Sequence, residues 1–263
     1  VTGTSIVATL KSTNNNYVVQ MQGNNASDKV YFGTTSGNDF LLANTSSVTE
    51  RVRITSDGKI GINKNSPNNF LHVAGSGYQI ARFENTDDTA NGAYAELYAN
   101  SSSPADNDVL GILSFKGNND ASQETTYTQI RTTATDVSDG SEDGDITFHT
   151  RAAGSFGEKL RITSAGRLGL GIAAPTKLLD IATATSADGI RVKSTGNTYN
   201  ELSFDANRTS ATTHIGRIIS NWNGTTVSYL SFDTGSDTSN KDDGQIRFWT
   251  SDGSGAYERL RIE

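Results

Sequence analysis

Carboxylates crowded into two glycine-containing stretches are the residues of this sequence best suited to chemistry. Five acidic residues fall within 136–145, and Asp233, Asp237, Asp242 and Asp243 occupy a corresponding stretch. Carboxylate oxygens can hold Ca²⁺, but the spacing here differs from that of an EF-hand loop. Aspartates in such loops more often cap backbone N–H groups. We therefore expect solvated turns and predict no metal ligands.

A pair of glutamates raises the question of glycan cleavage. Glu96 and Glu201 lie close to Tyr94 and Tyr199 in the sequence. Glycosidases need two carboxylates that face each other roughly 5–10 Å apart. Because both glutamates occupy the same position of a repeated layout, we expect each to point outward from a strand. We predict no catalytic residue and no enzymatic activity.

The histidines and the large aromatic residues are the remaining candidates. His72, His149 and His214 have neither metal-ligand nor catalytic-triad spacing. Aromatic side chains stack on sugar faces when exposed, but their alternation with polar residues here favours packing on a sheet. The aromatic residues considered are Trp222, Trp249, Tyr229 and Tyr257. We expect no cofactor and no cofactor-binding residue.

The sequence is organised by a tandem repeat. Residues 50–62 (Glu-Arg-Val-Arg-Ile-Thr-Ser-Asp-Gly-Lys-Ile-Gly-Ile) return at 158–170 as Glu-Lys-Leu-Arg-Ile-Thr-Ser-Ala-Gly-Arg-Leu-Gly-Leu, and 258–262 begin a third copy. A fixed period of this kind indicates stacked structural units. We divide the chain into an N-terminal partial repeat (1–62), a second unit (63–170) and a third unit that ends within the motif (171–263).

Each copy of the motif predicts two strands joined by a turn. Charged and apolar residues alternate with period 2, and Ser-x-Gly then supplies a turn in which glycine adopts positive φ. Gly61 and Gly169 lie opposite the apolar positions, where glycine permits close backbone approach at a crowded symmetry axis or a tight bend. Pro67 and Pro175 should end the ladder, because proline has no N–H. A further strand is expected at 71–73 and at 179–181.

Further short strands are expected between the motifs, separated by loops rich in Asn, Asp, Ser and Gly. The candidates are 80–83, 93–98, 110–115, 127–131, 190–192, 199–204, 215–219 and 227–232, together with an N-terminal relative from Ile6 to Phe32. Helical periodicity is absent over any convincing length. The sequence predicts an all-β fold.

The most regularly repeated charges belong to the motif itself. Glu50, Glu158 and Glu258 are each followed by basic residues. We hypothesise that they form cross-strand or inter-chain ion pairs that set the register of the sheet. Such pairs contribute little when they are exposed.

Composition narrows the possible functions. Only 34% of the 263 residues are hydrophobic, so we expect elongation and burial against other copies. The net charge of -7 argues against nucleic-acid binding. With 0 Cys there is no disulfide framework, and no apolar run reaches the roughly 20 residues that span a bilayer. We expect a soluble chain without membrane insertion.

The repeated motif resembles one found in bacteriophage tail fibres and tailspikes, often ahead of a C-terminal intramolecular chaperone. Residues 168–175 keep the Gly-x-Gly spacing and the proline of that pattern, whereas Asn63 replaces the second glycine in the first copy. The resemblance implies a parallel homotrimer with intertwined or side-by-side sheets, exposed on a virion and concerned with host attachment.

We therefore expect a repetitive, elongated fibre segment of a phage tail or capsid appendage. Its expected partners are two further copies of itself, other virion structural proteins and, as a candidate receptor, host cell-surface polysaccharide. Two alternatives stay open. Paired acids in an aromatic groove would favour a tailspike-type polysaccharide depolymerase, and a cell-wall anchor or secretion signal elsewhere would favour a bacterial surface adhesin.

Overall fold

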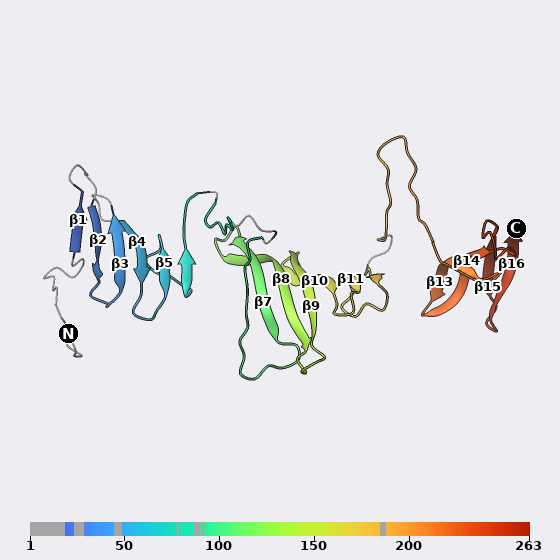
Figure 1. The fold of residues 1–263 in the computed structure, drawn as a ribbon, viewed down its shortest axis with the longest axis horizontal. Coiled ribbons are helices and arrows are strands. Elements are labelled where there is room, and N and C mark those ends of the chain that lie inside the picture. Colours follow the sequence, from blue (N-terminus) through green and yellow to red (C-terminus); the bar gives the residue numbers. More distant parts are fainter. Residues whose placement is uncertain are drawn as a thin grey trace. The chain divides into compact units, whose positions relative to one another are not determined.

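The computed structural model describes residues 19–23, 29–44, 49–77, 79–86, 90, 92–184 and 188–263, and within these ranges it contains strands and turns but no helix (Figure 1). The predicted all-β fold is therefore confirmed. None of the described residues forms a helix that could cross a membrane. The chain divides into two compact units, Val1–Asn100 and Ser101–Glu263.

The strands form three sheets, each built mostly by antiparallel neighbours along the chain. The first sheet contains β1 (Val19–Gln22), β2 (Lys29–Thr34), β3 (Phe40–Asn44), β4 (Thr49–Ile54), β5 (Ile60–Ile62) and β6 (Leu71–Val73). The second contains β7 (Val109–Asn118), β8 (Glu124–Asp136), β9 (Asp143–Ala152), β10 (Ser155–Ile162), β11 (Leu168–Leu170) and β12 (Leu179–Ile181). The third contains β13 (His214–Trp222), β14 (Thr225–Thr234), β15 (Gly244–Ser251) and β16 (Ala256–Ile262).

The turn predicted inside the motif is present in both complete copies. Gly58 and Gly166 have φ of 83° and 71°. Their N–H groups donate to the carbonyl oxygens of Thr55 and Thr163 over 2.9 and 2.8 Å. Glycine adopts this left-handed conformation at no steric cost, so the turn explains why it stands there.

The predicted break in the ladder is present at each proline, but the sheet continues beyond it. The strands at 71–73 and 179–181 form, but β6 pairs in parallel with β5, and β12 pairs in parallel with β11. Each proline lies in the short connection between the two parallel strands, outside the paired residues. The residue after β5 is Asn63 with φ of 51°, and its counterpart Gly171 has φ of 71°. Asparagine tolerates the left-handed region better than most residues, which explains this replacement in the first copy.

The same connection explains the central glycine of β5 and β11. A Cβ atom on Gly61 would overlap the carbonyl oxygen of Lys64, and one on Gly169 would overlap the carbonyl oxygen of Ile172. Of the two reasons for glycine that the sequence leaves open, the structure therefore supplies the tight bend.

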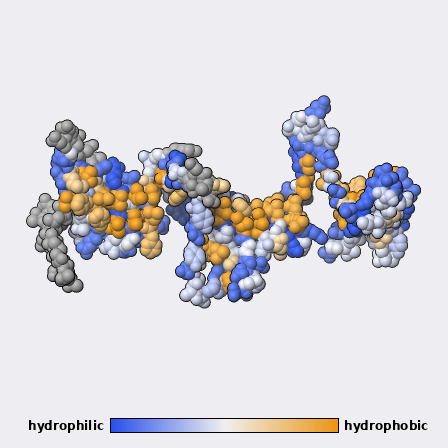
Figure 2. Space-filling model, viewed as in Figure 1, coloured by the Kyte–Doolittle hydropathy of each residue, from blue (hydrophilic) through white to orange (hydrophobic). Residues whose placement is uncertain are grey.

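Every sheet has one apolar face and one polar face. In the third sheet the cross-strand row Ile218, Leu230, Phe248 and Leu260 lies on the apolar face. Corresponding rows run through Leu113, Ile130, Phe148, Leu160 and Leu170 in the second sheet and through Phe32, Leu42, Val52 and Ile62 in the first. Figure 2 shows the hydrophobic residues gathered over the sheets.

Most of these apolar side chains are uncovered. Apart from proline and glycine, the only buried apolar residues among those described are Leu41, Ala43 and Ala134, whereas Leu113, Ile218, Leu260 and Ile262 are about half exposed. Leu41 and Ala43 alternate with the apolar row of β3, so they lie on the polar face. A single chain thus buries little of its apolar surface.

Half of the strand predictions between the motifs are wrong. Residues 110–115, 127–131, 215–219 and 227–232 lie in β7, β8, β13 and β14. Residues 80–83, 93–98, 190–192 and 199–204 form no strand, although they keep the alternating pattern. Their sequence suits a strand, but no strand among the described residues pairs with them. Of the N-terminal relative, Phe32 lies in β2 and residues 6–18 lie outside the described residues.

Candidate functional site: a repeated ionic cluster

A β-bulge places the repeated glutamate and arginine on the same face of each sheet. In an uninterrupted strand, residues three apart point to opposite faces. Pairing between β9 and β10 shifts at Lys159, so that Glu158 faces His149 and Leu160 faces Phe148. The extra residue brings Glu158 and Arg161 to the polar face together. The same shift occurs in β4 and in β16.

In the first and second sheets the arginine binds two carboxylates. Arg161 donates to both carboxylate oxygens of Glu158, from Nη2 over 2.7 Å and from Nε over 2.9 Å. Its Nη1 lies 2.5 Å from Asp145 Oδ2. The other oxygen of Asp145 accepts the backbone N–H of Ser164 over 3.0 Å. The cluster therefore ties β10 to the start of β9 and to the motif turn.

The first sheet repeats this arrangement atom by atom. Arg53 contacts Glu50 over 2.5 Å and Asp39 Oδ2 over 2.7 Å, while Asp39 Oδ1 accepts the N–H of Ser56 over 2.9 Å. The hypothesis of a cross-strand ion pair is correct for Glu258, whose Oε2 lies 3.8 Å from Nη1 of Arg247 on the neighbouring strand β15. Glu50 and Glu158 instead pair within their own strand, across the bulge, and it is their arginine that reaches an aspartate at the start of the neighbouring strand.

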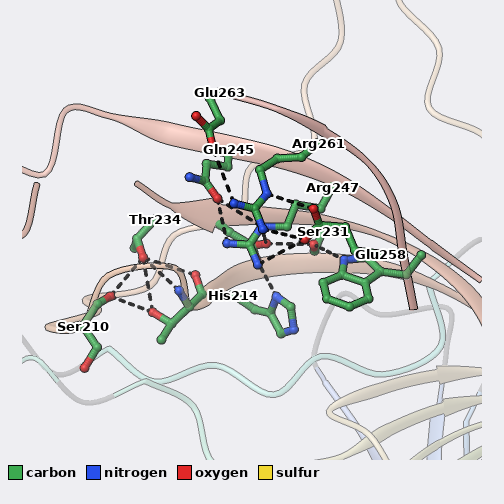
Figure 3. Close-up of polar contacts among 12 residues, drawn as sticks. Ser210, His214, Ser231, Thr234, Gln245, Arg247, Glu258, Arg261 and Glu263 are labelled. Carbon is green, nitrogen blue, oxygen red and sulfur yellow. Dashed lines mark hydrogen bonds and ion pairs between the residues drawn. The ribbon is translucent and has the colours of Figure 1, made fainter. Parts of the chain in front are cut away.

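The third sheet rebuilds the cluster around a buried aspartate. Arg261 still binds Glu258 through two 2.9 Å contacts, but Gln245 occupies the place of Asp145 (Figure 3). A second arginine, Arg247, places Nε 3.1 Å from Asp233 Oδ2. The Asp233 side chain is 0% exposed and that of Arg247 is 8% exposed.

Two further groups complete the surroundings of Asp233. His214 Nδ1 lies 2.5 Å from Asp233 Oδ1, and Ser231 Oγ donates to Asp233 Oδ2 over 3.0 Å. Trp249 Nε1 donates to Ser231 Oγ over 3.1 Å, and the Trp249 ring stacks on Tyr229 with centroids 5.2 Å apart. A buried carboxylate is stable only when its oxygens are bonded in this way.

The clusters hold their charges firmly. Hydrogen bonds to the partner glutamate raise the pKa of Arg53, Arg161 and Arg261 above the ordinary value for arginine. In the third sheet the hydrogen bonds from Arg261 lower the pKa of Glu258 below its ordinary value of 4.5. Arg261 and Glu258 therefore both stay ionised at neutral pH.

The arrangement suits register setting better than catalysis. Ser231 bonds to Asp233, and the only described partner of the His214 ring nitrogens is the same carboxylate. A nucleophilic triad requires the serine to bond to the histidine instead. The remaining histidines make structural contacts. Asn68 N–H lies 3.3 Å from His72 Nδ1, and His149 stacks on Phe156 with centroids 5.8 Å apart.

The expectation of solvated turns holds for only part of the acidic stretches, because Asp145 in β9 and Asp233 in β14 are buried and bound to arginine. Asp136 Oδ1 accepts the Ser138 N–H over 2.8 Å, and this bond lowers the pKa of Asp136. Asp243 accepts the N–H groups of Ser236 and Asp237, which lower its pKa. In the part of the chain that the structure describes, no three metal-ligating side chains group together.

The remaining candidates lie on exposed segments or on strands of the sheets. Glu96 and Glu201 both lie on exposed segments outside any strand, and they belong to different compact units. Trp222 is exposed at the end of β13, whereas Tyr257 lies in β16 beneath the guanidinium of Arg259.

One hollow was not foreseen from the sequence. It has a volume of about 340 Å³ and lies between residues 204–210 and the loop that precedes β15. Its lining includes Phe204, Arg208, Asp237 and Lys241, and Lys241 Nζ donates to Asn207 over 2.9 Å. Residues far apart in the sequence form it, so no local motif signals it.

Comparison with known proteins identifies the fold. No protein-family model matches the sequence, and no curated protein matches it. Among solved structures, the carboxy-terminal domain of the bacteriophage T5 L-shaped tail fibre is similar, with a TM-score of 0.53 and 13% identity over 70% of this chain and 87% of that chain. The T5 domain with its intramolecular chaperone domain gives a TM-score of 0.52 and 14% identity over 70% of this chain and 60% of that one. The chain therefore has an all-β fold of the kind found in a phage tail fibre.

Proposed function

We propose that this chain is a structural, non-catalytic segment of a phage tail fibre, in which three copies assemble side by side into an elongated shaft. The observation that carries the proposal is the distribution of side chains over the two faces of each sheet. The polar face is closed by bonded charges, while the apolar face of a single chain is largely uncovered. Burial of apolar surface is the main favourable contribution to association.

In a soluble monomer, the apolar face of a sheet would be covered by the chain itself and the charged side chains would face water. Copies of the same chain are suitable to cover these faces, because each copy carries the same rows at the same spacing. Likeness of fold to the T5 tail fibre domain supports the assignment to a fibre.

The mass in solution tests this proposal. One chain has a mass of 28.0 kDa, and we expect multi-angle light scattering to give three times that value. Small-angle scattering should give the profile of a rod. A particle with the mass of one chain at micromolar concentration would contradict the proposal.

For such a fibre we propose a role in host attachment, on the surface of a virion and joined to other virion structural proteins. Three identical copies would raise avidity without raising the affinity of any single site. The hollow beside Phe204 offers an aromatic ring together with charged and amide groups, a combination suited to a saccharide. Binding of purified host surface polysaccharide should weaken in D237A and K241A, and equal binding by these variants would exclude the hollow as the receptor site.

A further inference from the structure

Two extended segments carry strand-like sequence without belonging to any sheet. The first arm comprises the described residues 79–86 and 92–98, and the second arm comprises residues 188–204. Figure 1 shows the second arm as a long loop of two limbs that leads into β13. Its apolar residues include Ile190, Val192, Tyr199 and Leu202, which are 64% to 85% exposed. Exposed apolar side chains in strand-like alternation are typical of a segment that pairs with another chain.

The two limbs of the second arm are held together by side chains. Ser194 Oγ lies 2.8 Å from Thr198 Oγ1, and Asn200 Nδ2 donates to the carbonyl oxygen of Val192 over 3.3 Å. None of the residues 188–204 belongs to a strand. The limbs therefore pair with no strand in the part of the chain that the structure describes.

The last residue of the arm identifies a surface that can receive it. Phe204 stacks on Phe232 of the third sheet, with ring centroids 5.6 Å apart and an angle of 24° between the planes. Its ring also lies over Gly216, where a Cβ atom would overlap it. Gly216 and Phe232 face each other on the apolar side of the sheet. The apolar face thus accepts a side chain from the arm, and β13 lacks a side chain where the ring lies.

We propose that the rest of the second arm packs on the apolar face of the third sheet in a neighbouring copy of this chain. This inference rests on the proposed multi-chain assembly and adds the element that links the copies. A copy of the same chain fits as the occupant, because each copy brings one uncovered arm and one uncovered apolar face. The stacking of Phe204 on Phe232 is a contact of this kind within one chain.

The absence of cysteine makes cross-linking a clean test. A chain with L202C and one affinity tag is co-produced with a second chain that carries a different tag and I218C, L230C or F248C. These three acceptor positions form one row across the apolar face. A disulfide requires Cα atoms within roughly 7 Å, so it reports a direct contact. We expect mild oxidation to join the two tagged chains for at least one acceptor position.

Matched controls separate the possible outcomes. I219C lies next to Ile218 on the opposite face, and with L202C it should give no cross-link. A three-chain mass without any cross-link at the apolar row would overturn the arm inference and leave the proposed fibre intact. A one-chain mass would overturn both. A disulfide that forms only within a single chain carrying L202C and an acceptor cysteine would show that the arm folds onto its own sheet, and would also overturn the inference.

Discussion

At the scale of single residues, the arginine clusters should contribute measurably to stability. Replacing Arg161 with methionine leaves the Asp145 carboxylate, which is only 9% exposed, without its partner. Removing one member of a largely buried charge pair exposes the other to an uncompensated desolvation cost. We expect R161M to lower the free energy of unfolding by about 2 kcal/mol. Denaturant melts at one fixed chain concentration measure this change.

The matched control for R161M is the exposed pair formed by Lys116 and Glu124. Its atoms lie 2.9 Å apart, but its side chains are 49% and 70% exposed. Exposed pairs contribute little, so K116M should leave the free energy of unfolding nearly unchanged. Equal losses in the two variants would mean that burial does not strengthen the cluster.

A second prediction at this scale concerns pH. Hydrogen bonds from Arg261 lower the pKa of Glu258 in the folded chain, so the folded state favours the ionised form. This contribution is complete above the ordinary pKa of 4.5 and is lost as the pH falls through the lowered value. The melting temperature of E258Q should therefore lie below that of the wild type at pH 7. The difference should shrink as the pH is lowered below about 4. A difference that stays constant over this range would exclude the ion pair as its cause.

At the scale of elements, the short connection between parallel strands depends on glycine. In G169A the new Cβ would overlap the carbonyl oxygen of Ile172, so the connection between β11 and β12 must move. Overpacking of this kind costs roughly 1–3 kcal/mol. Hydrogen exchange should show faster opening of β12. In G157A, within β10, the added Cβ has no heavy atom within 4 Å, and stability should be unchanged. If hydrogen exchange in β12 of G169A is as slow as in the wild type, the close contact of Gly169 with the β11–β12 connection does not matter for stability.

The element scale also shows what sequence can and cannot predict. Alternation and Ser-x-Gly turns correctly located the strands of the motif, because both depend on residues close together in the chain. The same alternation misplaced strands at 93–98 and 199–204, because a strand also needs a neighbour and no strand among the described residues pairs with them. An alternating sequence indicates that a segment can form a strand, but it does not indicate whether a second strand is available to pair with it.

For the candidate site, the repeated glutamates were found but their partners were not. Glu158 and Arg161 share a face only because of the bulge at Lys159, and a one-residue insertion in the ladder has no clear signal in a single sequence. The repetition of Glu-(Arg/Lys)-x-Arg in three copies is the one hint of the bulge. Residues three apart in a regular strand point to opposite faces, so the glutamate and the last arginine can pair only if an extra residue lies between them. The network around Asp233 draws on β13, β14 and β15, so it depends on pairing that the sequence does not specify.

At the scale of the whole molecule, the two faces of the sheets should respond oppositely to a charge. Ile218 and Ile219 are adjacent in β13 and similarly exposed, at 52% and 41%, but they lie on the apolar and polar faces respectively. In a monomer, an aspartate at either position would reach water and cost little. In an assembly that buries the apolar faces together, an aspartate at 218 would carry an unpaired charge into the interface, which costs several kcal/mol.

We expect I218D to reduce the mass measured by light scattering to that of one chain, while I219D keeps the mass of the wild-type assembly. Circular dichroism should confirm that both variants retain their strands. If I218D keeps the full mass, the apolar face is not the surface that joins the copies. A loss of assembly in I219D alone would instead assign that role to the polar face and its ionic clusters.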